Sequence, residues 1–153
     1  AELAKLGRTA PTARHLQHVR GVGPIISTAM ACKGLNPDNF AKQRQFAACF
    51  GIVPKQHSSG NKIRLGEMTR SGDTYLRSIL IEGAHAVIQQ IRSDASDPYS
   101  RRIQRWVRRC GTQGAAVRLA NHNLRVIWVL LKHPERPFHS NPGLRAPTEI
   151  AMP

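Results

Sequence analysis

The sequence predicts a mainly α-helical fold, in which a helix-hairpin-helix is followed by a helical domain with a Ser-Gly loop or a short hairpin inserted. Apolar residues recur at helical spacing along most of the chain, most clearly over 76–91. Residues that favour helix starts (Pro, Asn or Asp) precede several of these segments. A stretch rich in Gly, Ser, Lys and Arg, residues 52–72, separates two groups of helices and contains few large apolar residues.

Three helices are predicted in the first part of the chain. Residues 2–19 have a composition that favours a helix. The tight turn of 21–24 ends on a proline suited to begin the next helix, which is buried and ends near Gly34. A third helix is predicted over 39–50, where phenylalanines and alanines form an apolar side.

The second part contains the most regular helix and an arginine-rich one. Residues 71–73 cap a helix whose apolar stripe continues to position 91. After a break at 93–98, a helix over 101–110 has apolar residues on one side and arginines on much of the rest. Two glycines then bracket a turn, and the last helix covers about 115–132.

These elements suggest three regions. Residues 1–52 form a helical region with the helix-hairpin-helix, 53–133 a serine loop plus a helical domain, and 134–153 a proline-rich, loosely ordered tail. The chain begins at Ala1 without a methionine, so we expect it to be part of a longer protein.

The charge of the chain favours nucleic acid as its partner. Lys and Arg number 23 against 9 acidic residues, a formal net charge of +14 that attracts polyanions. Such a charge is unusual for a metabolic enzyme, and the alternatives are an acidic membrane surface or a protein partner. Aromatic residues are only 5%, which argues against a surface built mainly on base stacking.

The chain lacks sequence signals for a membrane or for secretion. No apolar run approaches the about 20 residues of a membrane span, and no secretory signal opens the chain. The three cysteines, Cys32, Cys49 and Cys110, are widely spaced among apolar or small neighbours. We therefore expect reduced core cysteines in a cytoplasmic protein, with no membrane partner.

The turn before the second helix is a candidate phosphate contact. Gly21 and Gly23 flank one apolar residue between two helices, as in a helix-hairpin-helix. Glycines allow close approach to a phosphate, and the amides of the following helix start can bind it without reading sequence. An ordinary turn between helices is the alternative.

The Ser-Gly loop is a candidate catalytic site. Ser58 and Ser59 directly precede a glycine, and His57 could orient a hydroxyl or relay a proton. A serine that attacks a phosphodiester needs exposure and nearby cations. On the residues alone, a polar turn that contacts phosphates without chemistry explains the loop better. The cations around it are Lys55, Lys62, Arg64 and Arg70.

Two further observations concern charge. Five arginines within 101–109, with almost no acidic neighbours, suggest a helix face that follows phosphates, although a solvated surface is the alternative. No pair or triad of acidic residues has metal-site spacing, so we expect no metal or other cofactor in this chain.

Taken in order, these motifs resemble the C-terminal domain of bridge-RNA-guided, serine-type insertion-sequence transposases, relatives of the Piv-type DNA invertases. One departure is Arg20, where relatives often have proline. The resemblance covers residues 16–132, and the motifs that carry it are Gly21-Val22-Gly23-Pro24, Ala47-Ala48-Cys49-Phe50-Gly51-Ile52-Val53-Pro54, Gln56-His57-Ser58-Ser59-Gly60, Gly66-Glu67-Met68-Thr69-Arg70-Ser71-Gly72-Asp73 and Tyr75-Leu76-Arg77.

The resemblance implies a catalytic role in DNA transposition and recombination. Ser59, the serine directly before glycine, would form a phosphoserine link to DNA, with Ser58 its neighbour. An N-terminal domain would bind Mg²⁺. A structured guide RNA would bind to the protein, which would act as a homo-oligomer. The chain alone would bind nucleic acid without recombining it. We expect nucleic-acid contacts from Gly21, Gly23, Lys55, His57, Lys62, Arg64, Arg70, Arg77, Arg101, Arg105 and Arg108.

Two other functions remain open from the sequence. The first is a non-enzymatic helix-hairpin-helix module that only binds DNA. The second is a basic structural protein that binds RNA. An exposed Ser-Gly loop is required by a transposase and not by either alternative.

Overall fold

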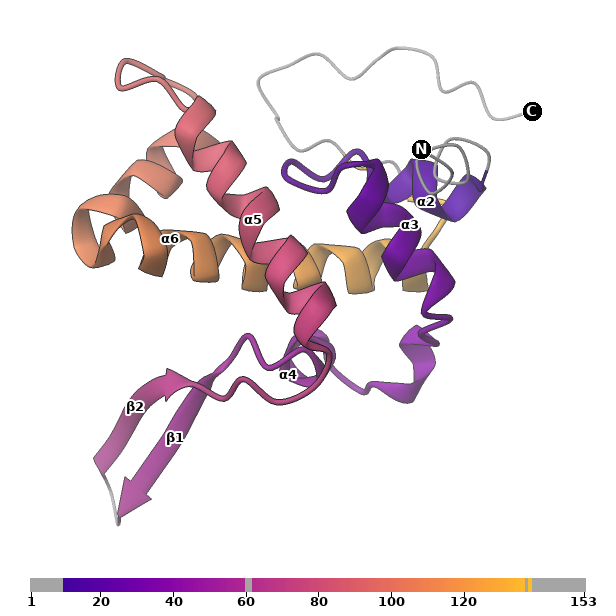
Figure 1. The fold of residues 1–153 in the computed structure, drawn as a ribbon, viewed down its shortest axis with the longest axis horizontal. Coiled ribbons are helices and arrows are strands. Elements are labelled where there is room, and N and C mark those ends of the chain that lie inside the picture. Colours follow the sequence, from indigo (N-terminus) through magenta and orange to yellow (C-terminus); the bar gives the residue numbers. More distant parts are fainter. Residues whose placement is uncertain (1–9, 60–61, 137, 139–153) are drawn as a thin grey trace.

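A computed structural model describes residues 10–59, 62–136 and 138, and within them the fold is mainly helical, as the sequence predicts (Figure 1). A hairpin of β1 (Pro54–Ser59) and β2 (Lys62–Met68) lies between two groups of helices. The helical elements are α2 (Pro11–Leu16), α3 (Pro24–Cys32), the short 3-10 helix η1 (Pro37–Asn39), α4 (Gln43–Cys49), α5 (Thr74–Gln90) and α6 (Pro98–Lys132).

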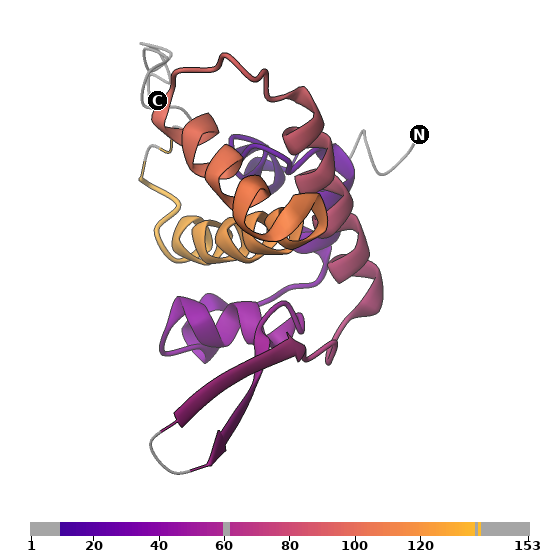
Figure 2. The same ribbon diagram turned by 90° about the vertical axis from the view of Figure 1, so that its left-hand side faces the viewer.

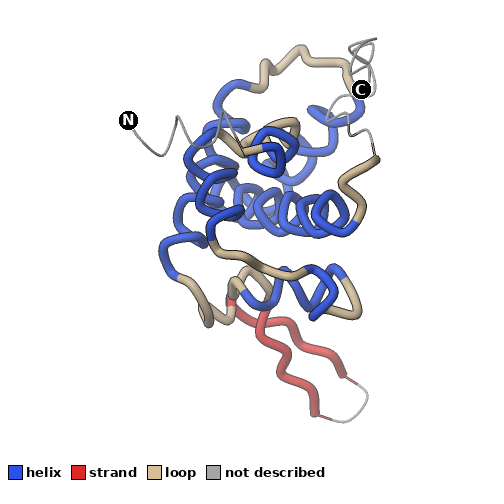
Figure 3. Tube along the Cα trace, turned by 90° about the vertical axis from the view of Figure 1, so that its right-hand side faces the viewer, coloured by secondary structure: helices blue, strands red, loops and turns tan. Residues whose placement is uncertain are grey.

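The Ser-Gly segment is a hairpin and not a coil. Strands β1 and β2 are antiparallel, with a register irregularity between Pro54 and Gln56. The hairpin leaves the helical body near α4 and extends away from it (Figures 2 and 3). The sequence left a loop and a hairpin as alternatives, and the structure selects the hairpin.

The helix starts predicted at Pro24 and Asp73 are confirmed, whereas α6 begins at Pro98, inside the segment predicted as a break. Pro24 occupies the first turn of α3, where a missing backbone N–H costs nothing. The Asp73 carboxylate accepts a 2.9 Å hydrogen bond from the Leu76 amide at the start of α5. Asp97 caps α6 in the same way, by accepting from the Ser100 amide at 2.9 Å.

The predicted helix over 39–50 is shorter than expected. The Asn36 side chain caps η1, and Phe40 then adopts an extended backbone. A second cap starts α4, because the Lys42 amide donates to the Gln45 side chain at 3.2 Å. Phe40 still contributes to the apolar side, packing edge-on against Phe46 with ring centroids 5.3 Å apart.

Helix α6 joins the two last predicted helices through a kink. Cys110 and Gly111 have non-helical backbone angles, and the φ of Gly111 is +71°. Gly114, predicted to close a turn, lies inside the second helical arm. The kink divides α6 into a first arm of 98–109 and a second arm of 112–132.

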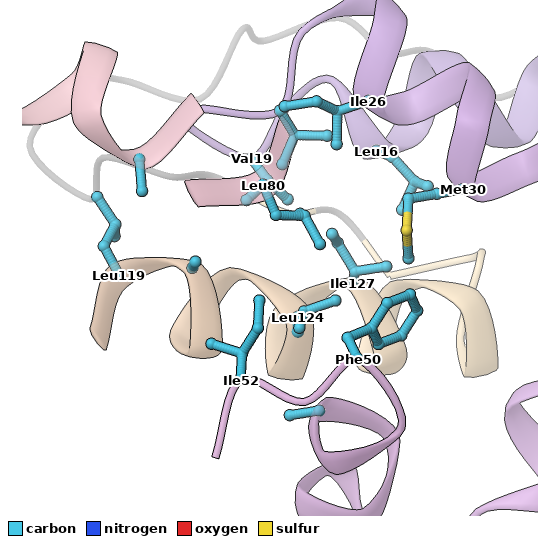
Figure 4. Close-up of a cluster of buried hydrophobic side chains, with 14 of the residues drawn as sticks. Leu16, Val19, Ile26, Met30, Phe50, Ile52, Leu80, Leu119, Leu124 and Ile127 are labelled. Atoms are coloured by element: carbon cyan, nitrogen blue, oxygen red, sulfur yellow. The ribbon is translucent and has the colours of Figure 1, made fainter. Parts of the chain in front are cut away.

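One core joins the helices (Figure 4). Leu124 and Ile127 on the second arm of α6 are fully buried and face residues from both halves of the chain. The expected boundary at residue 52 therefore does not divide the core, to which 1–52 and 53–133 both contribute. The side chains labelled in Figure 4 are Leu16, Val19, Ile26, Met30, Phe50, Ile52, Leu80, Leu119, Leu124 and Ile127.

The expectation of core cysteines is wrong. All three are free thiols, but all three are exposed. Cys32 and Cys49 are the last residues of α3 and α4, and Cys110 lies at the kink of α6. Helix ends project beyond the packed face, so apolar neighbours in sequence do not bury these side chains.

Candidate nucleic-acid interface

The hairpin holds the predicted catalytic segment in a fixed backbone register. The Cα of Ser59 is opposite that of Lys62, and the Cα of His57 is opposite that of Arg64. Ser58 is the neighbour of Ser59 in β1. The side chains of these five residues lie outside the part of the chain that the structure describes.

At the root of the hairpin, two predicted phosphate contacts are exposed: Lys55 and Arg70. Arg70 is the only non-glycine residue with a positive φ (+55°) among the described residues. Its amide donates to the Gly51 carbonyl at 3.2 Å, which helps to hold this sparsely populated conformation. Such backbone conformations are concentrated at functional sites.

Arg77 does not belong to the interface. Its side chain is only 9% exposed, and its guanidinium donates to the Ser71 carbonyl at 3.1 Å and to the Thr74 hydroxyl at 3.2 Å. A longer contact of 3.4 Å reaches the Phe50 carbonyl. Arg77 therefore fastens the hairpin root to α5, and its donors are occupied by protein acceptors rather than presented to a phosphate.

The first arm of α6 presents its arginines as the sequence predicts. Arg101, Arg105 and Arg108 are exposed. Arg102 is half-buried, and its guanidinium lies 5.4 Å from the centre of the Trp106 ring. Helix α6 contains seven arginines and one lysine but no acidic residue, so none of its own side chains can neutralise this charge.

The second arm adds a basic face that was not predicted from the sequence. Arg118, His122 and Arg125 line a cleft of about 790 Å³ between α6 and the hairpin root. Their spacing of i, i+4 and i+7 places them on one helix face, a signal that is present in the sequence. The apolar stripe of the same helix is the stronger periodic pattern in this segment, and it overlaps the basic one.

We call the combined surface the arginine cleft. A second hollow of about 470 Å³ on the first arm shares Trp106 with the first one. Among the described residues that line either hollow, Glu67 alone is acidic. The cationic residues of the arginine cleft are Arg70, Arg102, Arg105, Arg109, Arg118 and Arg125.

The electrostatics of the cleft keep His122 neutral. Burial lowers the pKa of His122 to about 4, and the positive charges of Arg102 and Arg125 act in the same direction. The neutral ring accepts a hydrogen bond of 3.2 Å from the Arg102 guanidinium at its Nε2 atom. His122 therefore orients an arginine of the cleft without adding charge of its own.

In the part of the chain that the structure describes, the arginines of the cleft form no ion pair with a carboxylate. Within residues 10–59, 62–136 and 138, the ion pairs join Lys33 to Asp73, Arg92 to Asp94, Lys132 to Asp38 and His133 to Glu135. None of these pairs includes an arginine of α6. The buried Nε atoms of Arg102 and Arg125 have no hydrogen-bond partner. An anionic ligand would supply the negative charge and the hydrogen-bond acceptors that these arginines lack.

The turn before α3 has a structural explanation at one of its two glycines. A Cβ on Gly21 would lie 2.9 Å from the Gly83 carbonyl oxygen of α5, and the φ of Gly21 is +86°. Gly23 is different, because an added Cβ would meet nothing within 4 Å. Packing against α5 thus accounts for Gly21, and only Gly23 is open to a phosphate.

No group of three His, Cys, Asp or Glu side chains in the described residues could hold a metal ion. None of the helices described is both long and apolar enough to cross a membrane.

Comparisons with known proteins identify relatives of the chain. Residues 13–101 match the model of the transposase IS116/IS110/IS902 family. A probable family 20 transposase of Pseudomonas aeruginosa is 43% identical over 118 residues, which are 77% of this chain and 35% of the relative. The transposase for insertion sequence element IS1111A of Coxiella burnetii is 33% identical over 134 residues, 88% of this chain and 36% of the relative. The chain thus spans about a third of the length of these curated relatives.

Proposed function

The chain belongs to the transposase IS116/IS110/IS902 family, and on this basis we propose that it is the DNA-binding, serine-bearing part of a transposase that acts on insertion-sequence DNA. The activity of the whole protein is part of this proposal, because the chain spans about a third of its relatives.

The arginine cleft is the observation that supports DNA binding best. It is lined by arginines from the hairpin root (Arg70) and from both arms of α6, a helix without acidic residues. Salt bridges do not occupy them in the described part of the chain. The planar fork of a guanidinium donates two parallel hydrogen bonds to a phosphate, so a nucleic-acid backbone matches this surface in charge and in geometry.

We assign the covalent step to Ser59. The Ser59 Oγ atom would attack the phosphorus of a phosphodiester, forming the Oγ–P bond while the bond from phosphorus to the leaving sugar oxygen breaks. A general base would accept the serine proton, and a general acid would protonate the departing sugar oxygen. Support comes from the hairpin, which extends away from the helical body (Figure 2) and pairs the backbone of Ser59 with that of Lys62. A lysine ammonium stabilises charge that develops on phosphate oxygens.

The remaining components of the assembly are also proposals. The Mg²⁺ implied by the resemblance would be held by another part of the protein, since the described residues offer no metal-binding cluster. A structured guide RNA and further copies of the protein would complete the complex. The arginines of the cleft would bind RNA as well as DNA, because both present the same phosphodiester backbone.

A trapping experiment tests the covalent assignment. The full-length protein with its nucleic acids should form a protein–DNA adduct that survives denaturation. The adduct should vanish in Ser59→Ala and persist in Ser58→Ala, a matched control one residue away. An adduct that persists in Ser59→Ala would show that another residue attacks. A protein that binds DNA without any adduct would instead support the helix-hairpin-helix binding module.

A further inference from the structure

A further pocket adjoins the arginine cleft, where the turn before α3 meets both arms of α6, and it shares Arg102, Arg105 and His122 with the cleft. Its volume is about 480 Å³. Arg20 comes from the turn, Tyr99 and Arg102 from the first arm, and His122 from the second arm. We call it the Tyr99 pocket. The Asn123 side chain ties the turn to the second arm by donating to the Arg20 carbonyl at 2.9 Å.

The Tyr99 pocket contains polar groups that the fold leaves unsatisfied. Tyr99 is 9% exposed, and its hydroxyl has no hydrogen-bond partner. The Nε atom of Arg102 is likewise buried without a partner. Leaving such groups unpaired is costly, so their persistence points to a ligand that supplies acceptor atoms.

The charge of the pocket specifies an anion. The guanidiniums of Arg20 and Arg102 lie 5.1 and 5.7 Å from the centre of the Tyr99 ring, which holds both in place. Arg105 also lines the pocket, and no described lining residue is acidic. The nearest carboxylate along the chain, Asp97, caps α6 and also interacts electrostatically with Arg20, so it offsets part of the charge of that arginine.

The shape of the pocket limits the size of the anion. Apolar side chains of Val19, Val126 and Phe138 form part of its wall. Its volume falls within the about 300–1,000 Å³ typical of small-ligand sites, which leaves room for a single nucleotide and excludes a base-paired duplex.

We propose that the Tyr99 pocket binds one unpaired nucleotide of a nucleic-acid strand, with its phosphate on Arg20, Arg102 and the Tyr99 hydroxyl. The sugar and base would lie against the apolar wall. This inference rests on the proposed function, because it assumes that the arginine cleft beside the pocket binds the same nucleic acid. A strand end or a nucleotide displaced from a duplex would meet the requirement.

Equilibrium binding of the chain to two probes tests the proposal. One probe is a single-stranded DNA of about eight nucleotides, and the other is a blunt duplex of the same length. Tyr99→Phe removes one hydroxyl and retains the ring, and Arg20→Lys retains the charge but loses the planar guanidinium; neither residue lines the arginine cleft. Each variant should weaken single-strand binding roughly tenfold or more, the effect of one hydrogen bond to a charged group, and change duplex binding by less than about twofold.

Arg44→Gln is the control, since Arg44 lies on α4 and lines none of these hollows. It should weaken both probes equally and by less than about threefold. If Tyr99→Phe affects both probes alike, or neither, the pocket does not hold an unpaired nucleotide. Repeating the measurement with an RNA strand of the same sequence shows whether the pocket binds DNA, RNA or both. A roughly tenfold loss of affinity in Tyr99→Phe for either strand supports the proposal. The adduct assay on Ser59 is independent, so each proposal can fail without the other.

Discussion

Replacement of Arg77 separates an arginine that supports the fold from the arginines that bind DNA. Arg77→Met keeps the length and apolar stem of the side chain but removes its donors to Ser71 and Thr74, which lie at 3.1 and 3.2 Å. Hydrogen bonds from a charged group contribute about 1.5–3 kcal/mol each, and the Ser71 carbonyl would lose a partner. We expect the free energy of unfolding to fall by about 3 kcal/mol, counting the 3.4 Å contact to Phe50 as negligible.

The matched variant is Arg108→Met, which removes the same charge from an exposed position on α6. Urea denaturation should show a change within about 0.5 kcal/mol for this surface substitution, whereas DNA affinity should fall. Arg77→Met should lower the free energy of unfolding but leave DNA affinity unchanged, once that affinity is corrected for the folded fraction. If Arg77→Met retains wild-type stability and weakens DNA binding as Arg108→Met does, then Arg77 is a phosphate contact after all.

Two further predictions concern the turn contact and the cleft histidine. Gly83→Ala places a Cβ against the Gly21 carbonyl oxygen and the Ile26 side chain, so thermal unfolding should show that the free energy of unfolding falls by about 1–3 kcal/mol. Gly23→Ala is the control and should be nearly neutral, because its added Cβ meets nothing within 4 Å. Equal effects of the two substitutions would disprove the close contact at Gly83. The pKa of His122 is lowered from 6.5 to about 4 in the folded chain, so the unfolded chain binds this proton first and stability should fall as the pH drops from about 6.5 to about 4. His122→Asn should remove that part of the acid sensitivity in urea titrations, and an unchanged pH profile would mean that His122 is not buried as neutral imidazole.

Local signals predicted much of the fold because caps and apolar periodicity act over a few residues. Asp73 caps α5 where the sequence places it. The helix over 39–50 was predicted too long because Asn36 and Gln45 provide two separate caps, which leave Phe40 extended between η1 and α4. Apolar spacing alone does not reveal such a break.

The site was harder to predict because it depends on contacts between distant segments. Arg77 looks like any surface arginine until the Ser71 carbonyl and α5 are brought together around it. The Tyr99 pocket requires Arg20 to meet the first arm of α6, and the bond from Asn123 to the Arg20 carbonyl holds the turn against the second arm. The catalytic role proposed for Ser59 comes from the resemblance to a known family. Composition and spacing alone favour a polar turn at this position.

The salt dependence of duplex DNA binding by this chain tests the central claim most directly. The arginine cleft predicts that the logarithm of affinity falls steeply with the logarithm of salt concentration, with a slope of several units. The triple variant Arg105→Gln, Arg118→Gln and Arg125→Gln should reduce that slope by about three, because each arginine that no longer neutralises a phosphate lowers it by roughly one unit. A flat salt response, or a slope that the triple variant leaves unchanged, would contradict a phosphate-binding role for the cleft.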